Sequence, residues 1–207
     1  MGNVRLSLTK LYLSLNGTRF LRVATVRLPY DHEVEIIIYS SKQDIVLGQT
    51  TITGAIAIHE SVLDLSYLLH YVVTHEDAHR RQWYSFLSIP FTAIFWLGAP
   101  ISLLYGLVAL GIFIAQREMS YLHMSLQSLL LSIVLLLIAC IYSWFIEYKA
   151  DGEAIRRLGV HTVLNARNYM ESLPRPSWIW RVIERMTHPP INFTIRINRF
   201  FNSEWSK

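Results

Sequence analysis

The chain is poor in cysteine and in charged residues. Cys140 is the only cysteine among 207 residues, which excludes an internal disulfide framework and a zinc site built on cysteines. Charged residues make up 16% of the chain, against roughly a quarter in soluble domains. Lys and Arg are scattered and no nucleic-acid motif is present, so the net charge of +4 indicates a face toward anionic lipid headgroups and no nucleic-acid partner. Any metal ion must be held by histidine and carboxylate side chains.

The apolar residues concentrate in two long runs. Residues 86–115 carry no charge and are long enough to cross a bilayer as transmembrane helix 1, and residues 126–146 are long enough for transmembrane helix 2. A polar connector, residues 116–125, joins them, so we expect an antiparallel hairpin of two spans. The first 15 residues lack the continuous apolar core of a signal peptide.

The positive-inside rule orients this hairpin. The connector carries one arginine, whereas five basic residues flank the outer ends of the two runs: Arg80, Arg81, Lys149, Arg156 and Arg157. We therefore expect a two-span protein of the cell membrane, with both termini in the cytoplasm and the connector outside.

The stretch His75-Glu76-Asp77-Ala78-His79 reads H-E-x-x-H. On a helix, residues four apart lie on one face, so His75 and His79 present two imidazole nitrogens to one point. Glu76 lies beside that point, which is how zinc hydrolases supply two metal ligands and a general base from one helical turn. A pattern of three fixed residues also arises by chance, so the motif requires a third ligand elsewhere.

The residues at the start of the chain indicate strands. Val4–Leu15 and Thr18–Leu28 both alternate polar and apolar residues, and the Asn16-Gly17 pair between them is typical of a hairpin turn. We expect residues 1–33 to form an N-terminal β-hairpin extension that adds to the sheet.

Residues 34–85 are expected to form the first part of a catalytic domain. Val34–Tyr39, Ile45–Gly48 and Gly54–Ile58 have the composition of short strands. From Ser61, the expected N-cap, apolar residues recur at helical spacing, so the motif falls in the C-terminal part of a helix.

The second apolar run continues without a breaker into Glu147-Tyr148-Lys149-Ala150-Asp151. We expect the helix to persist to Leu158, where Gly159 ends it. Because the two spans run antiparallel, Glu147 returns to the side of the membrane where the motif lies. The two histidines and Glu147 would hold one zinc ion with a fourth position open to water, and Asp151 would orient a ligand imidazole.

The combination of H-E-x-x-H, two spans and E-x-x-x-D resembles the HtpX / CAAX prenyl protease family of integral-membrane zinc metallopeptidases. In that family the glutamate of E-x-x-x-D is the third zinc ligand, which corresponds to Glu147. Thr187-His188-Pro189-Pro190 is similar to a family segment whose histidine lies near the active site, so the resemblance implies a catalytic role for His188. The resemblance covers residues 34–200, and where HtpX-type proteins usually carry two N-terminal spans we expect the β-hairpin of residues 1–33 instead.

The resemblance also implies residues that contact substrate. Thr194 stands where the family often has an arginine, and Arg196 is the nearest candidate for that role. The family has a substrate-pairing edge strand before the active helix. In this chain the equivalent place is occupied by Ile45, Val46, Leu47 and Gly48. We expect substrate to pair with these residues as an added β-strand.

We therefore expect an α+β, zincin-like catalytic domain, a small sheet with active-site helices, whose parts at 34–85 and 147–207 flank the transmembrane hairpin. The expected activity is zinc-dependent endopeptidase cleavage of membrane-associated or misfolded proteins at the cytosolic membrane surface, with Glu76 as general base. A regulatory metalloprotease that cleaves one repressor, resembling the β-lactam sensor-transducers, is an alternative, although the connector has no room for a folded sensor domain. A non-catalytic membrane protein that binds metal through the same residues is another.

Overall fold

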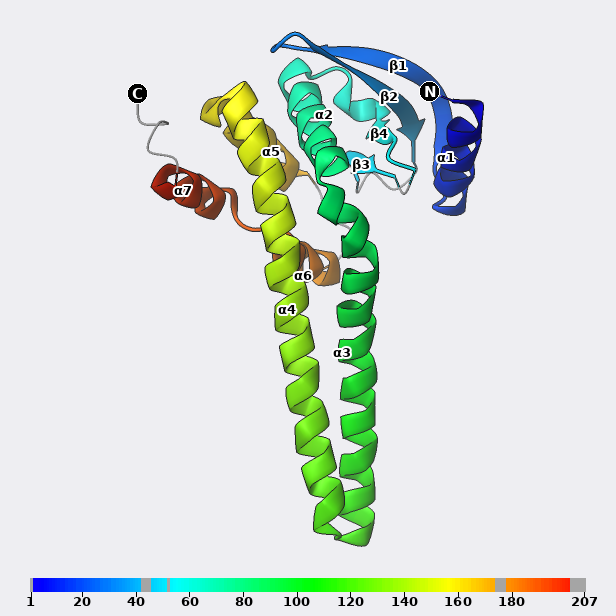
Figure 1. The fold of residues 1–207 in the computed structure, drawn as a ribbon, viewed down its shortest axis with the longest axis vertical. Coiled ribbons are helices and arrows are strands. Elements are labelled where there is room, and N and C mark those ends of the chain that lie inside the picture. The colour runs from blue at the N-terminus through cyan, green and yellow to red at the C-terminus, as the bar shows by residue number, and fades with distance from the viewer. Residues whose placement is uncertain (1, 42–45, 52, 174–177, 202–207) are drawn as a thin grey trace. The chain divides into compact units, whose positions relative to one another are not determined.

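The computed structural model describes residues 2–41, 46–51, 53–173 and 178–201 (Figure 1). The chain forms two compact units, one made of Met1–Trp83 with Ile146–Lys207 and the other of Tyr84–Phe145. The segment between the histidine motif and Glu147 is therefore an insertion, because the chain leaves the first unit after Trp83 and returns to it at Ile146.

The first unit is built on a mixed sheet with the strand order β1-β2-β4-β3. β1 (Arg19–Leu28) pairs antiparallel with β2 (His32–Ser40), and β2 pairs parallel with β4 (Ile56–His59). β3 (Gly48–Thr50) pairs antiparallel with β4 and lies at the edge of the sheet. The α+β prediction is confirmed at this coarse level, whereas the zincin-like fold remains a prediction.

The N-terminal hairpin prediction is wrong, because Asn3–Leu15 forms helix α1. Leu11, Leu13 and Leu15 alternate as in a strand, whereas Leu6 and Leu13, seven residues apart, lie on one face only in a helix. Leu is also a good helix former. Asn16-Gly17 ends this helix instead of turning a hairpin. Gly17 has a φ of 70°, and the bonds from Gly17 N to Ser14 O and from Thr18 N to Leu13 O close the helix in a Schellman motif.

The actual hairpin lies one element later, between β1 and β2 (Arg19↔Ser40 to Leu28↔His32). Its turn is Pro29-Tyr30-Asp31, in which Asp31 has a φ of 59°, a conformation that Asp tolerates better than most residues. The predicted boundary at residue 33 is therefore wrong as well, because β2 belongs to both the hairpin and the centre of the sheet.

Both faces of the sheet are covered. Successive residues of a strand point to opposite faces, so β2 sends Ile36 and Ile38 into one core with α2 and α5, and Ile37 and Tyr39 into a second core with Leu13 of α1. This arrangement explains why β2 reads as an almost continuous apolar run rather than an alternating one.

Helix α2 (Ser66–Arg81) carries the motif, as predicted, but begins five residues later than Ser61. Ser61 lies in a short 3₁₀ turn, η1 (Glu60–Val62), whose N-cap is the side chain of His59. Leu65 has an extended backbone (φ −115°, ψ 93°), so the helix can begin only after it.

The second unit contains most of two long helices, α3 (Trp83–Gln116) and α4 (Met119–Leu158), and both are long and apolar enough to cross a membrane. Within this unit they approach closely, because a Cβ on Gly106 would lie 3.2 Å from the carbonyl oxygen of Ser125 on the other helix. Ser132 Oγ also donates to the carbonyl oxygen of Ala99 at 2.7 Å.

The ten-residue connector predicted at 116–125 is wrong, since only Arg117 and Glu118 separate the two helices. Polar residues alone do not end a helix, whereas Arg117 does so here with a φ of 60°. The far end of α4 follows the prediction, because the helix continues to Leu158 and Gly159 ends it with a φ of 83°.

Three shorter helices complete the first unit after α4: α5 (Val160–Ser172), α6 (Trp178–Thr187) and α7 (Ile191–Phe201). α5 and α7 pack on the core that also holds α2, through Val163, Ala166, Ile191 and Ile195. On α4, Gly152 lies against Asn198 of α7, whose amide oxygen would be 3.1 Å from a Cβ at that glycine.

We predict that Gly48→Ala destabilises the fold by displacing β3 from α2. A Cβ built on Gly48 would overlap Cγ1 of Val72, and Val cannot turn this methyl away easily because its χ1 is restricted. Overpacking of this kind costs about 1–3 kcal/mol. Thermal unfolding in detergent checks this, with Gly48→Ala/Val72→Ala as the matched control because it removes the overlapping methyl. Equal stability of Gly48→Ala and wild type would contradict the packing of β3 on α2.

Candidate metal centre

The two histidines of the motif meet on one face of α2. His75 and His79 lie one turn apart in the last part of the helix, and their Nε2 atoms are 3.0 Å from each other. Their rings meet edge to face with centroids 4.6 Å apart. The backbone hydrogen bonds of a helix place residues four apart on one face, so the local sequence alone brings the two side chains to the same side of α2.

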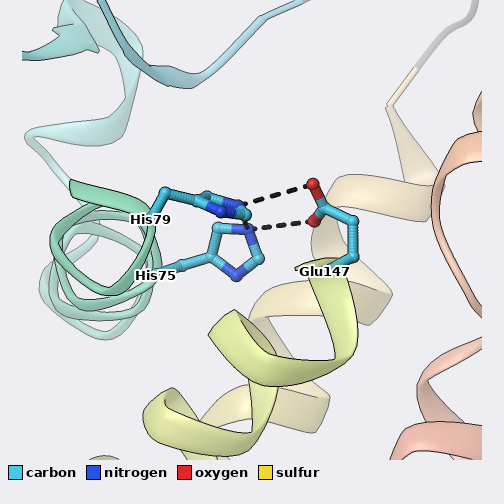
Figure 2. A group of neighbouring side chains, drawn as sticks. All are labelled: His75, His79 and Glu147. Carbon is cyan, nitrogen blue, oxygen red and sulfur yellow. Dashed lines mark hydrogen bonds and ion pairs between the residues drawn. The ribbon is translucent and has the colours of Figure 1, made fainter. Parts of the chain in front are cut away.

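Glu147 supplies the third group from α4 (Figure 2). Its Oε2 lies 3.1 Å from His75 Nε2, and its Oε1 lies 3.4 Å from His79 Nε2. The potential ligand atoms of the three residues all lie within 4.8 Å of one another. Glu147 thus converges with the motif, as predicted, although more than sixty residues separate them in the sequence.

This group can hold a metal ion. Ligands about 2.0–2.1 Å from a tetrahedral metal are about 3.4 Å apart. The two imidazole nitrogens are 3.0 Å apart, and His75 and His79 lie 3.1 and 3.4 Å from the two different oxygens of the Glu147 carboxylate. Glu147 Oε2 is also buried, and its neighbours are the Nε2 atoms of His75 and His188 at 3.1 and 3.4 Å. A buried carboxylate oxygen needs a positive partner, and a cation between the three side chains would provide one.

Asp151 lies one turn after Glu147 and contacts the other side of the His75 ring. Its Oδ1 is 3.0 Å from His75 Nδ1 and accepts a hydrogen bond of 2.8 Å from the hydroxyl of Tyr71. A carboxylate at Nδ1 fixes the ring so that Nε2 presents its lone pair to the ligand position. The structure therefore places Asp151 where the sequence predicted it.

The surroundings of His75 favour a positive charge. Burial lowers the pKa of His75, but hydrogen bonds and negative charge from Asp151 and Glu147 outweigh burial and raise this pKa to about 10. The same field that attracts a proton attracts a cation, and a metal ion would compete with that proton for the imidazole.

Two more groups come close from the C-terminal part of the chain. His188 Nε2 lies 3.4 Å from Glu147 Oε2. Burial lowers the pKa of His188; the charge of Glu147 raises it, but burial together with the charge of Arg167 outweighs this. Arg167 is buried on α5 and donates from Nη2 to the carbonyl oxygen of Pro189 at 3.2 Å. Burial lowers the pKa of Arg167, but the charges of Tyr71, Asp151 and Glu147 outweigh burial and raise this pKa above its usual value, so the guanidinium stays charged.

Glu76 is held at the edge of the sheet. Its carboxylate oxygen Oε2 is 2.9 Å from Thr50 Oγ1, which also lies 2.8 Å from the Glu76 carbonyl oxygen. Thr50 is the last residue of β3, and Gly48 at its other end lies against the Glu76 side chain. The glutamate of the motif therefore lies between α2 and the outermost strand.

The inner residues of the motif have structural roles. Asp77 is buried and forms ion pairs with Arg80 and Arg81, and His32 Nε2 of β2 is 3.6 Å from the same carboxylate. Ala78 is buried. Neither residue belongs to the group that can hold a metal.

The predicted substrate-contacting residues are only partly found at the site. Ile45 lies outside the described residues, and Val46 and Leu47 precede the edge strand, which begins only at Gly48 and runs to Thr50. Leu47 is buried in the core rather than presented at the edge. Arg196 is exposed on α7, whereas the arginine that interacts with Glu147 and Asp151 is Arg167.

Three residues of the site were not anticipated: Tyr71, Thr50 and Arg167. Tyr71 stands four residues before His75, so helical spacing alone places it on the same face and would have found it. Thr50 and Arg167 reach the site through strand pairing and helix packing, for which the sequence carries no local pattern.

No family model, no curated protein and no solved structure matches this chain. The resemblance to HtpX-type metallopeptidases therefore stays a prediction from the motifs.

We predict that the purified chain binds one zinc ion and that Glu147→Gln and His79→Ala lose it, because each removes one of three ligands. Asp151→Asn should weaken binding by about 10–100-fold, the usual loss for a group that orients a ligand histidine. Competition with a chromophoric chelator measures these affinities.

His161→Ala is the matched control for the histidine variant, since His161 is exposed on α5 in the same unit. Its zinc affinity should equal that of the wild type. Unchanged zinc binding in both Glu147→Gln and His79→Ala would contradict the assignment of the centre.

Proposed function

We propose that the chain is a membrane-anchored, zinc-dependent endopeptidase that acts on protein segments close to the bilayer. The observation that carries the proposal is the convergence of His75, His79 and Glu147 at ligand distances, next to a buried glutamate on the same helix. Two imidazoles and one carboxylate are the protein ligands of many catalytic zinc sites, which leave one position for water or substrate.

The donor set favours zinc over harder ions. Magnesium and calcium prefer oxygen ligands in larger numbers, whereas two imidazole nitrogens and a carboxylate oxygen in a compact group suit zinc. Zinc held there would polarise the attacking water and the scissile carbonyl group.

Glu76 is the proposed general base and acid. It would accept a proton from the attacking water and deliver it to the leaving amine when the peptide bond breaks. The hydroxyl of Thr50, 2.9 Å from its carboxylate, would hold Glu76 in position through both transfers. His188, beside Glu147 and only half-buried, would donate a hydrogen bond to the oxygen of the tetrahedral intermediate.

The outer edge of β3 is the proposed docking line for substrate. It is the last strand in the sheet order, and a peptide in extended conformation can pair with such an edge through backbone hydrogen bonds. Because Thr50 belongs to this strand and contacts Glu76, a paired peptide would lie next to the proposed base. Sequence selectivity would then come from the alternate side chains of the bound peptide.

The two candidate spans support a membrane location, and their flanking charges support a cytoplasmic site. Proteins at or in the bilayer are therefore the proposed substrates, in a role like the protein quality control of HtpX-type enzymes. The connector of two residues between α3 and α4 leaves no space for a sensor domain there, which disfavours the alternative of a signal-transducing protease.

We predict that Glu76→Gln keeps its zinc but loses about 10²–10⁴-fold in peptide-bond hydrolysis, since positioned acid–base groups contribute that much. The assay uses zinc-loaded full-length chain in nanodiscs with an unfolded protein substrate, followed by mass spectrometry of the cleavage products. Glu60→Gln is the matched control, because Glu60 is an exposed glutamate in η1, and it should keep full activity.

Two results would overturn the proposal. One is zinc-loaded wild type that cleaves neither an unfolded nor a membrane-bound substrate, which favours a non-catalytic metal site. The other is a Glu76→Gln variant as active as the wild type.

A further inference from the structure

Helix α1 exposes a continuous apolar stripe to solvent. Val4, Leu8, Leu11 and Leu15 are 75%, 51%, 56% and 79% exposed, and their spacing of four, three and four residues puts them on one face of the helix. Scattered exposed leucines are common on protein surfaces, but four in a row along a single helix face mark an interaction surface.

The opposite face of α1 is fixed to the sheet. Leu13 is fully buried with Ile37 and Tyr39 of β2, and Leu6 packs against the same core. Thr9, also fully buried, donates its hydroxyl hydrogen to Arg5 O or shares it with Thr53. Because these contacts hold the helix from behind, α1 cannot rotate to bury the stripe within the described part of the unit.

The stripe lies in the most basic part of the chain. The first 30 residues contain no acidic residue and five basic ones, which leaves 14 basic against 15 acidic residues in the rest of the chain. Four of the five are exposed, and Arg27 also pairs with Asp31. The basic residues are Arg5, Lys10, Arg19, Arg22 and Arg27.

Two of these charges flank the stripe on α1 itself. Arg5 follows Val4, and Lys10 precedes Leu11, so at 100° per residue they fall on opposite sides of the apolar face. Lys10 Nζ lies 4.3 Å from the centre of the Phe20 ring of β1, which holds the ammonium beside the helix. An aliphatic face on a helix with basic residues to either side is typical of helices that lie in a membrane interface. Of the two, Lys10 is exposed, whereas the guanidinium of Arg5 lies beside Gly54.

We propose that α1 is an interfacial helix that inserts its stripe of Val4, Leu8, Leu11 and Leu15 into the headgroup region of an anionic bilayer. The bilayer is the occupant that the observations favour, because the same chain carries two helices able to span one and because anionic headgroups complement the acid-free first 30 residues. The proposal does not depend on metal binding or on hydrolysis.

The test uses the full chain in nanodiscs, with Cys140→Ser to remove the native thiol and one bimane label per chain. Labels are placed at Leu8→Cys on the stripe, at Asn168→Cys on α5 and at Leu130→Cys on α4. Leu130 is exposed within a candidate span, and Asn168 is an exposed residue of α5, which packs on the other face of the sheet from α1. Lipids brominated near the carbonyl end of the acyl chain act as the quencher.

We expect the label at Leu8 to be quenched in discs containing phosphatidylglycerol and the label at Asn168 to remain bright. Discs of pure phosphatidylcholine should reduce the quenching at Leu8. Lys10→Gln should lower the ratio of membrane-docked to undocked α1 roughly fivefold, as expected for one basic residue near an anionic surface. Quenching at Leu130 with deeply brominated lipid shows that the spans are inserted.

Several results would overturn the proposal. A bright label at Leu8 in discs where Leu130 is quenched would show that the stripe stays in water. Protection of the Leu8 label only in discs that hold two chains would show that the stripe is a contact between copies. A bright label at Leu130 would instead show that the spans do not insert, which removes the reason to choose lipid as the occupant.

Discussion

The contact of Glu147 with His75 and His79 is the constraint on which the first unit depends. Glu147 and Asp151 place two carboxylates one helical turn apart at a largely buried position, where like charges repel and unpaired charges are costly. The compensating positive groups come from other elements, His75 from α2 and Arg167 from α5. His188, in the turn before α7, places its ring beside Glu147. The charges are balanced only when all of these elements pack together, so the site and the fold require each other.

The central residues of this site could be predicted because their geometry is local or follows from a simple connection. The spacing of His75 and His79 is set by one helical turn, and Glu147 and Asp151 are related in the same way on α4. The residues after the second apolar run contain no helix breaker before Gly159, which predicted that the helix continues to Leu158. The structure confirms this, because α4 ends at Leu158 and Gly159 has a positive φ. The two helices that are able to span a membrane could also be predicted from the length and composition of the apolar runs.

Predictions from the sequence were wrong where one pattern fits two structures, and incomplete where a contact joins residues far apart in the chain. Leucines between Val4 and Leu15 satisfy both strand and helix spacing, and the Asn16-Gly17 pair is as suitable for a Schellman helix end as for a hairpin. Thr50 reaches Glu76 only because β3 joins the sheet edge next to α2. Arg167 interacts with the site only because α5 packs next to it, and the spacing of residues along the sequence does not predict that packing.

X-ray absorption at the zinc edge would show whether His75, His79 and Glu147 hold one ion, because it reports which atoms surround the metal. For zinc-loaded wild-type chain in nanodiscs, we expect two imidazole nitrogens and carboxylate or water oxygens at about 2.0–2.1 Å, with no sulfur. Replacing Glu147 by Gln should change this inner shell. A shell with one imidazole or with oxygens alone, or a shell unchanged by Glu147→Gln, would contradict the convergence of α2 and α4 on one ion.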